Sequence, residues 1–69
     1  MQKLLQAWAQ AIAEAEFHYA MAFCARHGAR ARALHRARRE ERRAAAIART
    51  LKQEYGVDPE TALRNGEIK

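Results

Sequence analysis

Residues 22–33 read AFCARHGARARA and contain Gly28, the only glycine or proline among the first 55 residues. The rest of those 55 residues is rich in Ala, Leu, Glu, Gln, Lys and Arg, which lose little conformational entropy in a helix. A glycine in the interior of a helix costs about 1 kcal/mol. The sequence therefore predicts a break at His27-Gly28-Ala29, between helices at about residues 2–27 and 29–55.

Residues after the second helix predict a third, short one. Gly56 suits the left-handed position that follows a helix, and Asp58 is a good N-cap. Pro59 is favoured at the first position of a helix, and an Asn-Gly pair ends the segment after about two turns. We expect this helix at about residues 59–64, with Val57, Ala62 and Leu63 packed on the first two helices and the last three residues frayed.

The predicted fold class is all-α: a single domain, residues 1–69, that forms an antiparallel two-helix hairpin followed by a short helix. Two helices of this length bury too little surface to be secure alone. We therefore expect the hairpins to dimerise into a helical bundle, which covers the apolar faces of both copies.

Apolar side chains recur at three- and four-residue steps in the first helix and predict its core stripe: Leu4, Leu5, Trp8, Ile12, Ala15, Tyr19, Ala22 and Phe23. Phe17, Met21 and Cys24 follow the same spacing on nearly the opposite side. A helix that is apolar all round must be buried all round, and one neighbouring helix cannot do this. The dimer or partner interface is therefore predicted to comprise Trp8, Ile12, Phe17, Tyr19, Met21, Phe23 and Cys24.

The second helix has a thin, alanine-rich apolar stripe and a basic face that includes Arg32, Arg36, Arg39, Arg42 and Arg43. Glu40 lies four residues after Arg36 and three before Arg43, spacings at which opposite charges meet on a helix. Much of the basic face is therefore expected to be paired within the helix.

No pattern in the chain predicts catalysis, a metal or a cofactor. Cys24 and His27 have a C-x2-H spacing, but a structural zinc site needs four convergent ligands. The sequence contains no serine, no glycine-rich phosphate loop and no paired carboxylates on one helix face. We expect a protein that is not an enzyme, with Cys24 as a small buried thiol.

Nucleic acid is the alternative partner, since the net charge is +5. One version uses the arginine-rich helix, although residues 27–48 contain no aromatic residue, Asn or Gln with which to recognise bases. The other uses residues 47–64, which resemble a truncated helix-turn-helix in which Thr61 and Arg64 face DNA.

The number of cysteines and the length of the apolar runs bear on where the protein is located. A single cysteine fits a reducing compartment, and no apolar run approaches the roughly 18 to 20 residues that cross a bilayer. We therefore expect a cytoplasmic protein without membrane insertion.

The extent Met1 to Lys69, the bias toward Ala and Arg and the paired-helix pattern resemble the small all-helical proteins that transposable phages of GC-rich bacteria make early, in particular phage quorum-sensing anti-activators. The resemblance implies a homodimer in the host cytoplasm that binds a LuxR-type activator and blocks its access to DNA. It also implies binding to the ATPase that extends type IV pili. These implications concern the whole chain and assign no residue.

Overall fold

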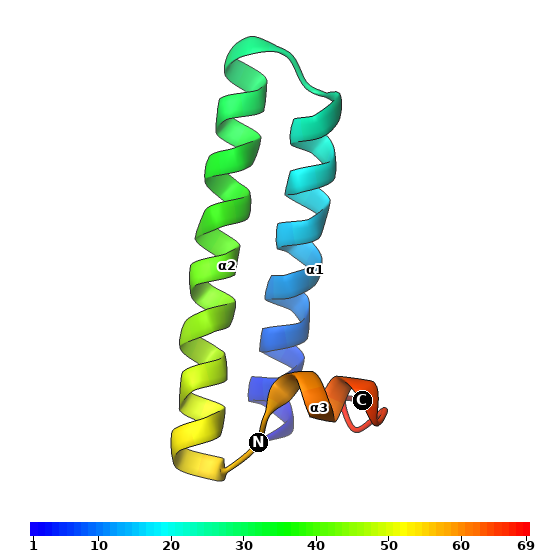
Figure 1. Ribbon diagram of the computed structural model, residues 1–69, viewed down its shortest axis with the longest axis vertical. Helices are drawn as coiled ribbons and strands as arrows, with labels where there is room; N and C mark the ends of the chain where they lie inside the picture. Colours follow the sequence, from blue (N-terminus) through cyan, green and yellow to red (C-terminus); the bar gives the residue numbers. More distant parts are fainter.

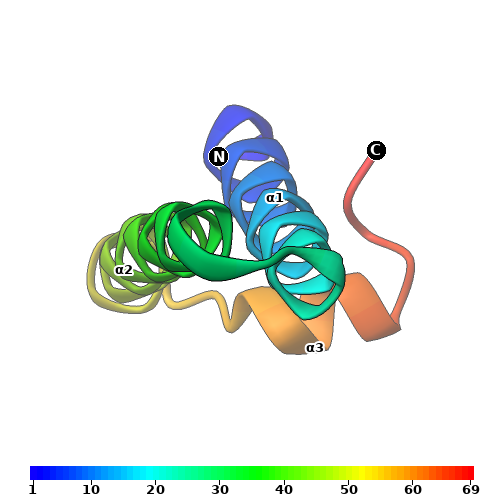
Figure 2. The same ribbon diagram turned by 90° about the horizontal axis from the view of Figure 1, so that it is seen from above.

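The computed structural model describes all of residues 1–69 and consists of three helices with no strand. Helices α1 (Gln2–Cys24) and α2 (His27–Tyr55) lie side by side and run in opposite directions, and the short α3 (Pro59–Arg64) packs against both near the start of α1 (Figures 1 and 2). The molecule is elongated, with extents of 42 × 21 × 15 Å. No helix combines the length and the apolar character that a membrane span requires.

The turn between α1 and α2 lies earlier than the glycine predicts. Ala25 and Arg26 are extended, and His27 then takes a left-handed backbone with φ 53°. Gly28 lies inside the first turn of α2. The predicted break at residues 27–29 was therefore wrong by two to three residues, because the chain reverses through its extended residues and His27 without using the freedom of the glycine.

The C-terminal end of α2 and the start of α3 confirm the predicted local signals. Gly56 has φ 64°, and the N–H groups of Gly56 and Val57 both donate to the carbonyl of Leu51. Asp58 caps α3 by accepting a hydrogen bond from the N–H of Glu60. Each of these contacts satisfies a backbone group that the end of a helix leaves without a partner.

The core is thin and consists mostly of alanine. Its buried apolar side chains are Leu5, Trp8, Leu51, Ala11, Ala15, Ala22, Ala37, Ala44 and Ala62. Only three of them are large, and these lie toward the end of the molecule where α3 packs. The alanines let α1 and α2 approach closely, but they bury little apolar area per residue.

The residues after α3 contact α1 and were wrongly expected to fray. The side-chain amide of Gln2 donates to the carbonyl of Glu67 at 2.9 Å, and that of Gln6 donates to the carbonyl of Lys69 at 2.7 Å. Between them, Ile68 is half-buried and packs against the core. The hydrogen bonds and this apolar contact hold the segment in place.

Candidate protein-binding surface

Three large apolar side chains remain exposed in the second half of α1, toward the end where Ala25 and Arg26 join the long helices, which we call the tip. The exposed fractions are 60% for Phe17, 50% for Met21 and 88% for Phe23. Phe17 and Met21 are four residues apart and share one side of α1. Clustered exposed apolar side chains mark binding surfaces more often than isolated ones do.

A shallow groove of about 230 Å³ lies beside Phe17 and Met21, between α1 and α2. We call it the tip groove; its lining residues are Phe17, His18, Met21, Ala25, Ala29, Arg32, Ala33 and Arg36. The Phe17 ring meets the His18 ring edge to face, with their centroids 5.4 Å apart. The volume lies below the roughly 300 Å³ at which small-molecule sites begin. The groove therefore suits side chains of a partner better than a cofactor.

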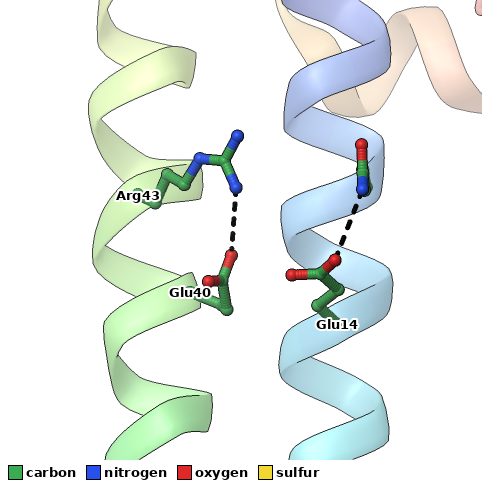
Figure 3. A network of polar contacts seen from close by, with 4 residues as sticks. Glu14, Glu40 and Arg43 are labelled. Atoms are coloured by element: carbon green, nitrogen blue, oxygen red, sulfur yellow. Dashed lines mark hydrogen bonds and ion pairs between the residues drawn. The ribbon is translucent and has the colours of Figure 1, made fainter.

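The groove carries unneutralised positive charge. Residues 25–39 contain six arginines and no Asp or Glu. The single ion pair of the molecule joins Arg43 Nη1 to Glu40 Oε2 at 3.5 Å (Figure 3). The predicted pair between Arg36 and Glu40 is not formed, so the expectation that much of the basic face is self-paired was wrong.

Polar pairs lie opposite each other on the two long helices. Gln10 donates to the Glu14 carboxylate at 3.3 Å on α1, and the Glu40–Arg43 pair faces them from α2 (Figure 3). Glu14 and Glu40 are thus engaged within their own helices. Neither carboxylate bonds to Arg32 or Arg36, which leaves both groove arginines free for a partner.

The other predicted basic-face residues, Arg39 and Arg42, are exposed on α2 and make no ion pair. Of the predicted interface residues, the groove brings together only Phe17 and Met21.

Trp8 is 5% exposed inside the core, and Ile12 packs against the same cluster, so the prediction that Trp8 contacts a partner was wrong. Cys24 is exposed, contrary to the expected buried thiol. Phe23 was predicted to face the core, and this was wrong because its neighbour Ala22 is buried there instead. Successive side chains of a helix point about 100° apart, so Phe23 is directed away from the core.

Tyr19 is half-buried on α1, and charged side chains of α2 influence its hydroxyl. The Glu41 carboxylate of α2 is the main cause that raises the pKa of Tyr19 above 10.0, while Arg38 acts in the opposite direction. The Tyr19 hydroxyl is therefore sensitive to the charges of α2, which the stripe in the sequence did not indicate.

The segment that resembles a helix-turn-helix has a second helix of only six residues. The hydroxyl of Thr61, expected to face DNA, donates to Asp58 Oδ2 at 3.0 Å. Val57 is half-buried and Ala62 is buried, both as expected, but Leu63 is 52% exposed. This segment therefore serves as a cap on the ends of α1 and α2.

Several groove residues were not assigned to the predicted interface, namely His18 and three alanines. The signal available for the alanines is the four-residue spacing of Ala25, Ala29 and Ala33, which runs through the turn into α2.

No three His, Cys, Asp or Glu side chains come together in a way that could hold a metal ion.

Comparisons of the chain with protein families, with characterised proteins and with solved structures found no match.

Proposed function

We propose that this protein is a non-enzymatic inhibitor that acts by binding another protein through its tip. The single observation that carries the proposal is the exposure of Phe17 and Met21 beside a groove with two unpaired arginines. Aromatic residues, methionine and arginine are the residues that protein interfaces favour. A stoichiometric inhibitor needs only such a surface, placed over a region that its target requires.

Homodimerisation is part of the proposal: two helical hairpins pair along α1 to form a bundle. Ala13, Ala20 and Cys24 are exposed along the outer side of α1, where their small size lets a second helix approach closely. A thin core also favours additional cover from a second copy. Sedimentation tests this: Ala20→Glu should convert dimers to monomers, whereas Gln53→Glu on the exposed part of α2 should not.

The proposed target follows from the resemblance of the whole chain to phage anti-activators. We propose that the protein acts in the host cytoplasm, where it binds a LuxR-type quorum-sensing activator and blocks its DNA binding, and that it also binds the ATPase that extends type IV pili. Both targets are proteins, in agreement with an apolar surface as the binding element.

The test is affinity capture from nuclease-treated host lysate, read by mass spectrometry. Phe17→Glu and Met21→Glu place a charge on the apolar surface and should abolish capture of the target, whereas Gln53→Glu should leave it unchanged. When the protein is added to a purified complex of the activator with its promoter DNA, the DNA should dissociate from the activator. Undiminished capture by both tip variants would contradict the proposal.

Nucleic-acid binding through α2 is a second candidate, favoured by the arginines that have no carboxylate partner. Phosphate contacts make affinity fall steeply with salt, while an apolar protein interface is much less sensitive. A steep salt dependence for a DNA or RNA duplex, lost in Arg39→Ala and Arg42→Ala, would support this candidate.

A further inference from the structure

We propose that the tip groove binds an acidic amphipathic helix of another protein. An apolar side chain of that helix lies between Phe17 and Met21, and its carboxylates bond to Arg32 and Arg36. The inference rests on the proposed function, since it names the kind of partner that the same surface accepts.

The shape of the groove favours a helix as the occupant. The two long helices that border the groove run side by side (Figure 1), and the lining between its larger side chains is made of small residues: Ala25 at the turn and Ala29 and Ala33 on α2. An amphipathic helix presents apolar side chains at three- and four-residue steps, as helix-in-groove complexes require. The volume of about 230 Å³ is larger than the 150 Å³ cavity that one benzene occupies, and it accommodates one or two such side chains.

The charge of the groove specifies the polar side of the partner. Arg32 and Arg36 are four residues apart and lie on one side of α2, and no carboxylate of this chain bonds to either. Guanidinium groups bind carboxylates through two parallel hydrogen bonds. A partner with Glu or Asp beside its apolar stripe would complement both arginines.

The same charge excludes contact between the tips of two copies. Residues 25–39 carry only positive charge, so two tips in contact would place like charges together. A nucleic-acid backbone would neutralise the arginines but offers no apolar side chain to cover Phe17 and Met21, which are each at least half exposed. The combination of apolar and basic groups therefore favours an acidic protein helix.

The test is fluorescence anisotropy with a labelled synthetic peptide that has Leu at helical spacing and Glu on either side. A second peptide replaces each Glu by Lys. We expect the Glu peptide to bind and the Lys peptide not to bind. The double variant Arg32→Glu with Arg36→Glu should weaken binding at least ~10-fold, because two charge-assisted contacts become repulsive.

The matched control is the double variant Arg42→Glu with Arg49→Glu, which makes the same change of net charge at exposed positions outside the groove. It should change the affinity by less than ~3-fold, the effect of general charge alone. Equal losses in the two double variants would overturn the proposal, as would equal binding of a scrambled Glu peptide without an apolar face. Tight binding of a DNA duplex with no peptide binding would favour nucleic acid instead.

Failure of this inference differs from failure of the proposed function. If Phe17→Glu abolishes capture of a protein from lysate while Arg32→Glu with Arg36→Glu does not, the protein-binding role stands and the acidic helix is wrong. If neither change reduces capture, the tip is not the binding surface. Circular dichroism should show unchanged helix content in every variant, because each altered side chain is exposed.

Discussion

His27 takes the left-handed backbone at the start of α2, whereas its neighbour Gly28 continues the helix without a positive φ. A Cβ added at Gly28 would meet only the Arg32 guanidinium, at an ordinary contact distance of 3.5 Å. The glycine therefore costs helix stability without using its conformational freedom.

Gly28→Ala should raise the free energy of unfolding by about 0.5 to 1 kcal/mol, because alanine favours the helix and restricts the unfolded chain. Urea unfolding followed by circular dichroism measures the change. Gly56→Ala is the control: its φ of 64° is costly for alanine, so this variant should lose about 1 kcal/mol. A destabilised Gly28→Ala would show that the glycine is required at the turn.

Local chemistry explains which parts of the fold could be predicted. Asp58 and Gly56 act on backbone groups within a few residues of themselves, so their roles can be recognised from the sequence. The position of the turn depends instead on the length over which α1 and α2 stay in contact. The residues around Gly28 do not determine that length.

The candidate site was predictable only in part, for the same reason. Helical spacing correctly separated Phe17 and Met21 from the core. It could not tell which large side chains of the core stripe would find no room between α1 and α2, where the buried residues are mostly alanine. Phe23 was misplaced because spacing gives an angle around α1, whereas exposure depends on the width of the contact with α2. The groove itself requires both helices and has no counterpart in either one alone.

Ile68→Ala should lower the free energy of unfolding by about 1 to 2 kcal/mol, the value of a half-buried aliphatic side chain. Glu67→Ala keeps the backbone carbonyl that accepts from Gln2 and should have little effect. Thermal unfolding of both variants checks the comparison. Equal stability of Ile68→Ala and the wild type would mean that the last residues do not pack on the core.

The Tyr19 hydroxyl should titrate differently once Glu41 is neutralised. In a Tyr55→Phe background, where tyrosinate absorbance reports only Tyr19, Glu41→Gln should lower the pKa toward 10.0, and Arg38→Gln should raise it further. Because the folded-state pKa lies above the unfolded value, the associated stabilisation is complete below pH 10 and is lost as the pH rises through the folded pKa. Unchanged titration in both variants would show that neither Glu41 nor Arg38 acts on the Tyr19 hydroxyl.

Ala44→Leu should destabilise the protein by about 1 to 3 kcal/mol, because Ala44 is 2% exposed and the added carbons must force α1 and α2 apart. Its neighbour Ala45 is exposed, and leucine is nearly as good a helix former as alanine, so Ala45→Leu should change stability by less than about 0.5 kcal/mol. Urea unfolding of the pair separates packing from helix propensity. An equal loss of stability in the two variants would mean that the close packing of α1 against α2 at Ala44 does not hold the helices together.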